Sequence, residues 1–115
     1  MIENPKGELL LLKRDKEPFV GYWHVPGGFL LKNEPIEICI LRLAKEELGL
    51  TIDLKQTEKL GLFETINEDP RGHILHYPVR IKLKGISNKN YFEILPRKTI
   101  PFHIKFLEKL GYKVE

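Results

Sequence analysis

The segment GGFLLKNEPIEICILRLAKEELGL, residues 27–50, constrains the fold more strongly than any other part of this sequence. Two glycines open it, and from Glu34 onward the apolar residues recur with the period of an α-helix. They stand four positions apart on one face, with Leu41 beside them: Ile36, Ile40, Ala44 and Leu48. Gly49 is placed to end the helix. The pattern predicts a helix that packs this apolar face on the core.

A second face of the same predicted helix carries charge. Arg42 and Glu46 are neighbours at helical spacing, with Glu47 beside them, and such a pair on a solvated helix contributes only about 0.3–0.5 kcal/mol. The two preceding glycines favour a functional interpretation, because a backbone without Cβ atoms can approach a ligand closely. Carboxylate oxygens beside such a loop suit Mg²⁺ or Mn²⁺, which hold substrate phosphates. Glu34, near the helix start, is placed to hold the loop in shape.

Short apolar runs on both sides of this helix are typical of strands. The runs before it are 7–14 and 22–26. The runs after it are rich in β-branched and aromatic residues and cover 58–66, 73–83 and 91–95. A closing amphipathic helix is expected within 100–112. Strands, helix, strands and helix in this order predict an α+β fold with helices packed on a mixed sheet.

The composition predicts one globular domain, residues 1–115, since 42% of the residues are hydrophobic and 30% are charged. No apolar run approaches the ~18 residues of a membrane span, and the first residues lack the pattern of a secretory signal. The lone Cys39 cannot form an internal disulfide, so a reducing cytoplasmic location is expected. Because the lysines behind the net charge of +3 are scattered, we expect a small-molecule partner, and neither nucleic acid nor a membrane.

The glycines, acids and arginine of the 27–50 segment resemble the Nudix box, the signature of the Nudix hydrolase family. That signature is glycine, five residues, glutamate, seven residues, arginine and glutamate, an aliphatic residue, one residue, two glutamates, one residue, glycine and an aliphatic residue. Six of its seven fixed letters are present: Gly28, Glu34, Arg42, Glu46, Glu47 and Gly49. The resemblance covers nearly the whole chain and implies the Nudix fold, a mixed β-sheet sandwiched between helices in an α/β/α arrangement.

The family's proteins bind a divalent cation, usually Mg²⁺, and hydrolyse nucleoside diphosphates linked to another moiety. Carried over by position, Glu46 and Glu47 match its metal-binding acids. Gly27 or Gly28 would offer a backbone carbonyl, with Gly27 taken as a metal ligand and Gly28 as a substrate contact. Arg42 would orient the glutamates. The resemblance also implies a homodimer, which is common among such proteins.

Leu43 departs from the signature, because most of the family has a glutamate there that binds metal or helps to activate water. The stretch Glu3–Gly28 is similar to the GDP-mannose mannosyl hydrolase branch, which also has leucine at this position and keeps the glutamate equivalent to Glu47. In that branch, water attacks the anomeric carbon of the sugar and releases the nucleoside diphosphate. Arg14 falls where an arginine neutralises the leaving diphosphate, and His76 is expected to contact diphosphate or sugar.

Two parts of that branch's pattern are short or missing, namely the first strand and a loop near residues 86–90 that carries the general base. The base is therefore not identified, and His24 and His103 are interpreted as packing or surface residues. Three functions stay open. The leading one is hydrolysis of a nucleotide sugar such as GDP-mannose. The alternatives are pyrophosphate cleavage of an ADP-ribose-like or nucleotide substrate, and a nucleotide-binding module without catalysis.

Overall fold

A five-stranded mixed sheet lies at the centre of the computed structural model, which describes residues 1–84 and 90–115. The strands follow the order β5-β8-β1-β2-β9. Their bounds are Ile2–Glu3 for β1, Leu9–Leu10 for β2, Glu58–Lys59 for β5, Val79–Lys82 for β8 and Tyr91–Phe92 for β9. Because β1 runs parallel to β8 and antiparallel to β2, the sheet is mixed, as the sequence predicts.

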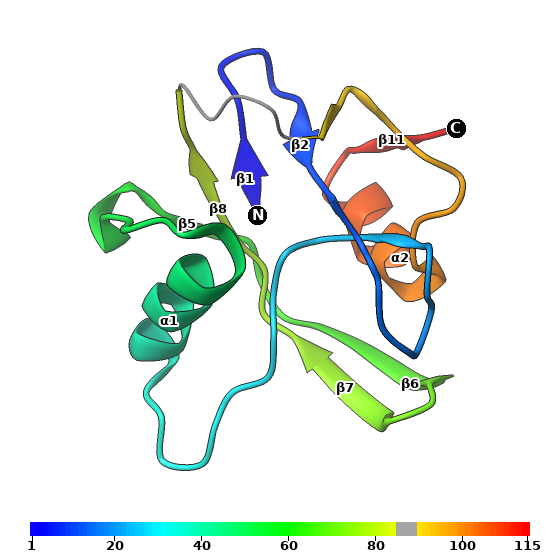
Figure 1. The fold of residues 1–115 in the computed structure, drawn as a ribbon, viewed down its shortest axis with the longest axis horizontal. Coiled ribbons are helices and arrows are strands. Elements are labelled where there is room, and N and C mark those ends of the chain that lie inside the picture. Colours follow the sequence, from blue (N-terminus) through cyan, green and yellow to red (C-terminus); the bar gives the residue numbers. More distant parts are fainter. Residues whose placement is uncertain (85–89) are drawn as a thin grey trace.

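Three separate two-stranded sheets accompany the central sheet. They pair β3 (Leu12–Lys13) with β4 (Trp23–His24), β6 (Phe63–Asp69) with β7 (Gly72–His76), and β10 (Ile94–Leu95) with β11 (Lys113–Val114). A short 3₁₀-helix, η1 (Leu54–Gln56), precedes β5. The β6–β7 hairpin projects away from the central sheet in Figure 1. It forms one of the elements around the candidate site.

The two helices are α1 (Ile36–Leu48) and α2 (Pro101–Lys109). Gly49 ends α1 in the left-handed conformation at φ 66°, and proline occupies the first turn of α2, as predicted. The apolar face of α1 is covered only from Ile40 onward. The prediction is wrong for Ile36, which is 46% exposed because the first turn of the helix extends beyond the residues that it packs against.

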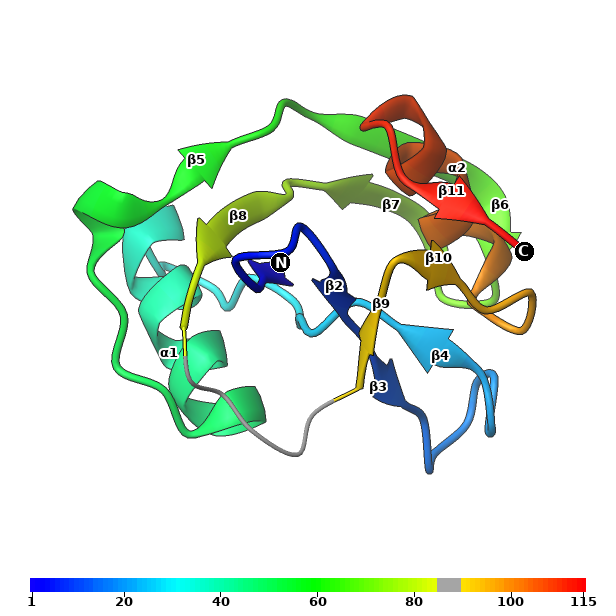
Figure 2. The same cartoon turned by 90° about the horizontal axis from the view of Figure 1, so that it is seen from above.

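Alternate residues of the strand that begins with β2 face two separate cores. Leu9 and Leu11 pack with Phe106 and Leu107 of α2. Leu10 points to the opposite face, where it packs with Ile2 and Ile81 and is joined by the α1 residue Leu48. The helices therefore cover opposite faces of the sheet, as Figures 1 and 2 show. The predicted α/β/α arrangement is confirmed.

The two segments expected to be short can be located only in part. The first strand is present as the two residues of β1. The loop expected near 86–90 falls, apart from Asn90, outside the described residues. Within residues 1–84 and 90–115, no helix is both long and apolar enough to cross a membrane.

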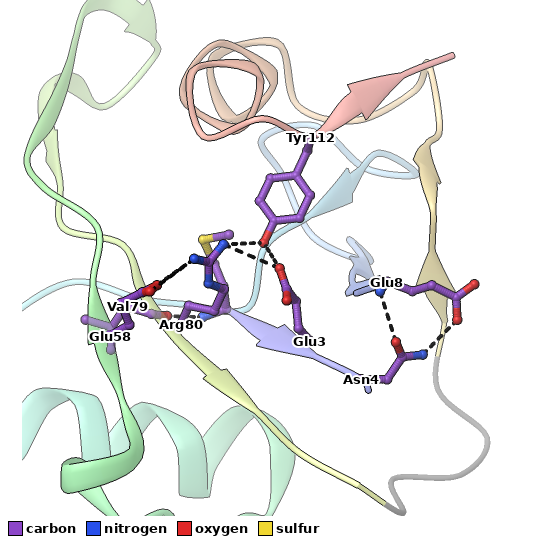
Figure 3. A network of polar contacts seen from close by, with 8 residues as sticks. Glu3, Asn4, Glu8, Glu58, Val79, Arg80 and Tyr112 are labelled. Atoms are coloured by element: carbon purple, nitrogen blue, oxygen red, sulfur yellow. Dashed lines mark hydrogen bonds and ion pairs between the residues drawn. The ribbon is translucent and has the colours of Figure 1, made fainter. Parts of the chain in front are cut away.

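A buried carboxylate ties the first strand to the C-terminal segment (Figure 3). Glu3 is 6% exposed and accepts a hydrogen bond from the hydroxyl of Tyr112. Arg80 on β8 donates to the same hydroxyl at 3.2 Å and lies 3.4 Å from Glu3. It also forms an ion pair with Glu58 on β5 at 2.5 Å. The network joins three neighbouring strands with the segment that follows α2.

We expect Tyr112→Phe to lower the free energy of unfolding by about 1–3 kcal/mol, because Glu3 would lose a hydrogen-bond donor while remaining buried. Urea unfolding followed by circular dichroism would measure this change. Tyr22→Phe, at a half-buried tyrosine outside the network, is the matched control. Equal stabilities of the two variants would contradict a structural role for the network.

Candidate active site

A cavity of about 310 Å³ lies between α1, the loop that follows β4, the β6–β7 hairpin and α2. Five of the predicted site residues line it: Arg14, Gly27, Gly28, Glu47 and His76. These residues come from distant parts of the sequence, and the fold brings them together around one space. The other two predicted residues, Arg42 and Glu46, are not among the lining residues.

Arg42 holds the loop against α1 through one guanidinium group. Its Nε donates to Glu34 Oε2 at 2.7 Å and its Nη2 to Glu34 Oε1 at 3.0 Å, which makes a bidentate pair. Nη2 also donates to the carbonyl of Phe29 at 3.0 Å. Nη1 donates to Glu46 at 3.0 Å on the exposed side of the helix. Arg42 thus fixes the loop and turns Glu46 away from the cavity.

Leu43 forms the cavity wall between Glu47 and the glycine loop, residues 25–35, which joins β4 to α1 and carries Gly27 and Gly28. Its side chain lies so close to Gly28 that a Cβ atom added there would come within 2.6 Å of Leu43 Cδ2. Glycine at position 28 allows this packing, because any larger residue would force the Leu43 side chain to shift. The leucine occupies the wall where the family signature would place a carboxylate.

Glu47 is the residue of α1 that offers a carboxylate to the cavity. Among the described residues, no group of three or more His, Cys, Asp and Glu side chains could hold a metal ion. The donor set still fits Mg²⁺, because this ion keeps several waters and uses one or two carboxylates together with substrate phosphates. The Glu47 carboxylate and the Gly27 carbonyl are the hard oxygen donors that would hold it.

Arg14 also lines the cavity and organises the loop that precedes β4. Its Nε donates to the carbonyls of Pro18 at 2.6 Å and Lys16 at 3.2 Å, and its Nη2 donates to that of Glu17 at 3.2 Å. These bonds hold the guanidinium in one place at the cavity wall. A pre-positioned cation of this kind suits an anionic ligand.

His76 lies across the cavity, on β7. Its Nε2 is 3.0 Å from the hydroxyl of the buried Thr65, and its ring packs 5.3 Å from that of Phe106. Burial lowers the pKa of His76 from its ordinary value. The imidazole is therefore held neutral and oriented by the hydroxyl.

Asp69 and Arg71, which were not among the predicted site residues, also line the cavity. Arg71 donates through Nε and Nη2 to the two oxygens of the buried Asp69, at 2.9 and 2.7 Å. Its guanidinium lies 4.9 Å from the centre of the Phe29 ring, so the hairpin meets the glycine loop. The sequence does indicate a turn at DPRG, residues 69–72. In it, the Asp69 side chain accepts a hydrogen bond from the amide of Arg71.

His24 and His103 line the cavity as well, which the interpretation of them as packing or surface residues did not anticipate. His24 is at the end of β4 and His103 is in α2. Burial lowers the pKa of both side chains, and that of His103 falls to about 3. Three imidazoles therefore share the cavity with two arginines.

Comparison with known proteins agrees with this geometry. The family model described as NUDIX domain matches residues 1–102. An ADP-ribose pyrophosphatase from Methanocaldococcus jannaschii is 40% identical over 68 residues, which are 59% of this chain and 39% of that protein. The low-salt glycan biosynthesis protein Agl8 from Haloferax volcanii is 35% identical over 86 residues, which are 75% of this chain and 47% of that protein. The chain spans less than half the length of either relative.

A solved structure shows the same fold over almost the full length of both chains. It is a MutT NUDIX hydrolase from Burkholderia pseudomallei, with a TM-score of 0.77 and 22% sequence identity. The match covers 96% of this chain and 95% of that one. At this level of identity, the likeness is one of fold.

Glu34→Gln should flatten the acid dependence of stability. The hydrogen bonds from Arg42 lower the pKa of Glu34 from 4.5 to about 2. A lowered carboxyl pKa stabilises the fold above the unfolded-state pKa, and this contribution is lost as the pH falls through the folded-state pKa. The Tm of the variant should therefore lie below that of the wild type above about pH 4.5 and approach it toward pH 2. Calorimetry over this range would test this.

The matched control for that experiment is Glu37→Gln, at an exposed glutamate in the first turn of the same helix. Its Tm should follow the wild type at every pH. A Tm difference for Glu34→Gln that does not change with pH would contradict the role given to the ion pair with Arg42.

Gly28→Ala should lower the free energy of unfolding by about 1–3 kcal/mol, because the new methyl group overlaps Leu43. Leu43→Ala would remove the overlap, so the double variant should cost less than the sum of the two single changes. Chemical denaturation of all four proteins measures the coupling. Strictly additive costs would mean that the two side chains do not interact.

Proposed function

Because the chain belongs to the Nudix family, we propose that it is a divalent-metal-dependent hydrolase of nucleoside diphosphates linked to a second group. Its substrate is a nucleotide sugar such as GDP-mannose, and the products are the nucleoside diphosphate and the sugar. The observation that carries this proposal is the cavity wall formed by α1. Leu43 and Glu47 line that wall, whereas Glu46 is bonded to Arg42 outside it.

A helix wall with a single carboxylate suits stabilisation of a leaving group. Leucine cannot bind a metal or take a proton, so position 43 does not activate water. Glu47 and the Gly27 carbonyl would hold Mg²⁺, which supplies positive charge to the diphosphate when bound. Arg14, held by backbone carbonyls, adds a second positive charge toward the same group. Attack at the sugar carbon needs this neutralisation of the departing diphosphate more than activation at phosphorus.

The remaining residues position these groups. Arg42 orients the loop and helix through Glu34, and Gly28 lets the substrate and Leu43 approach the backbone. His76, held by Thr65, contacts the diphosphate or the sugar. Glu46 supports Arg42, which makes it a positioning residue in this proposal and not a metal ligand. The proposal includes the cytoplasmic location and the homodimer expected from the sequence.

Pyrophosphate cleavage of an ADP-ribose-like substrate is the second candidate. The name of the M. jannaschii relative, an ADP-ribose pyrophosphatase, favours it. The name of the H. volcanii relative, a glycan biosynthesis protein that matches a larger share of this chain, favours sugar-nucleotide chemistry. The two candidates differ in the atom that water attacks.

Hydrolysis in ¹⁸O-labelled water distinguishes the candidates. We expect the label in the released sugar when GDP-mannose is hydrolysed with Mg²⁺, and mass spectrometry of the products would detect it. Label in the phosphate would identify the second candidate and overturn the first. Absence of turnover on nucleotide sugars and ADP-ribose, with nucleotide binding retained, would show a binding module.

Glu47→Gln should reduce turnover by about 100-fold or more, because the helix would offer no charged oxygen to the metal. Steady-state kinetics at several Mg²⁺ concentrations would measure the loss. Glu37→Gln, on the same helix and far from the cavity lining, should keep wild-type turnover. Equal activity of both variants would remove Glu47 from the proposed metal site.

A further inference from the structure

The backbone of Val25 is hydrogen-bonded to two imidazoles of the cavity. Nδ1 of His24 lies 2.8 Å from the carbonyl oxygen of Val25. The amide N–H of Val25 donates to Nδ1 of His103 at 3.3 Å. His103 is 78 residues away along the chain, and it reaches Val25 because α2 packs beside the glycine loop.

These two bonds assign opposite tautomers to the two rings. A carbonyl oxygen only accepts, so Nδ1 of His24 carries the proton and its Nε2 keeps a lone pair. An amide N–H only donates, so Nδ1 of His103 is the acceptor and the proton of that ring is on Nε2. A neutral His24 is thus a base at Nε2, and a neutral His103 is a donor at Nε2.

Both Nε2 atoms are available to a ligand. Neither makes a hydrogen bond within residues 1–84 and 90–115. In that part of the chain, only the hydroxyl of Tyr91 is a buried side-chain polar atom without a partner. Neither Nε2 atom belongs to that class, and both residues line the cavity. His76 differs, since its Nε2 already meets the hydroxyl of Thr65.

The charged groups around each ring act on its pKa in opposite directions, the carboxylates raising it and the cationic side chains lowering it. Those that act on His24 are Arg14, Asp15 and Glu47. Those that act on His103 are His24, His76, Asp69 and Arg71. Burial is the largest influence on both rings and favours their uncharged forms.

We propose that Val25 fixes these imidazoles so that His24 presents a proton acceptor, and His103 an N–H donor, to the ligand in the cavity. The catalytic part rests on the proposed function. Water oxygen bonds to the attacked carbon as the bond to the diphosphate breaks, and the leaving oxygen keeps the electron pair. One water proton passes to Nε2 of His24, and the resulting imidazolium later returns it to solvent. His103 donates to an oxygen of the substrate.

Long-range ¹H–¹⁵N correlation spectra of the labelled protein would test the tautomers directly. We expect the proton on Nδ1 of His24 and on Nε2 of His103. Addition of GDP with Mg²⁺ should shift the Nε2–H resonance of His103. The reversed tautomers, or an unchanged resonance with GDP bound, would overturn the proposal whether or not the protein turns over a substrate.

Kinetics on GDP-mannose would test the proton acceptor. His24→Asn keeps an N–H for the Val25 carbonyl and lacks Nε2, so kcat should fall by about 10²–10⁴-fold while KM stays within about threefold. Added imidazole should restore part of the kcat of His24→Ala. His103→Phe should mainly raise KM, by about two- to tenfold, since it removes one hydrogen bond. The matched control is His73→Asn, at an exposed histidine paired with Glu64 away from the cavity.

The outcomes separate this proposal from the proposed function. Turnover by the wild type with an undiminished kcat in His24→Asn, or no rescue of His24→Ala by imidazole, would exclude His24 as the base and leave the hydrolase proposal standing. A wild-type protein without turnover would remove the hydrolase proposal. The spectra would then still decide whether Val25 sets the two tautomers.

Discussion

The bidentate ion pair between Arg42 and Glu34 joins the two segments that make one wall of the cavity. The arginine belongs to α1, and the glutamate belongs to the loop before it, so the pair fixes how far the glycines stand from the helix. Arg42 also donates a hydrogen bond to the carbonyl of Phe29, whose ring contacts Arg71 of the β6–β7 hairpin. Together with the packing of Leu43 on Gly28, these bonds hold the loop that carries Gly27 against the helix that carries Glu47. The proposed metal site needs these two oxygen donors to keep a fixed separation.

The strongly local features of this fold were predictable from the sequence. Periodicity and residue type predict the end of α1 at Gly49 and the proximity of Arg42 and Glu46. The order of the strands and helices along the chain predicts the mixed sheet. Ile36 was mispredicted, because helical spacing shows which residues share a face and does not show how far the neighbouring elements extend. The loop near 86–90 falls mostly outside the described residues, so that expectation stays a prediction.

The parts of the site that the sequence did not predict depend on contacts between distant segments. The sequence predicts His24 and His103 as packing or surface residues, because neither belongs to a functional motif in its own segment. His24 adjoins Val25 in the sequence, and the packing of α2 beside the glycine loop brings His103 to the same residue. Arg71 is a similar case. Its residues predict a turn, but they do not predict that the turn lies against Phe29. No local pattern encodes which loops meet across a cavity.

The contact between Phe29 and Arg71 joins the loop before α1 to the β6–β7 hairpin beside the cavity. Both side chains are substantially exposed, and a cation–π contact at an exposed site contributes only about 0.5–1 kcal/mol. This is close to the thermal energy, so the two side chains separate and rejoin spontaneously. The two hydrogen bonds to Asp69 hold the Arg71 guanidinium, so the side chain that moves is that of Phe29. A ligand that displaces the Phe29 ring would therefore break only a weak contact, and it would leave the Arg71–Asp69 ion pair in place.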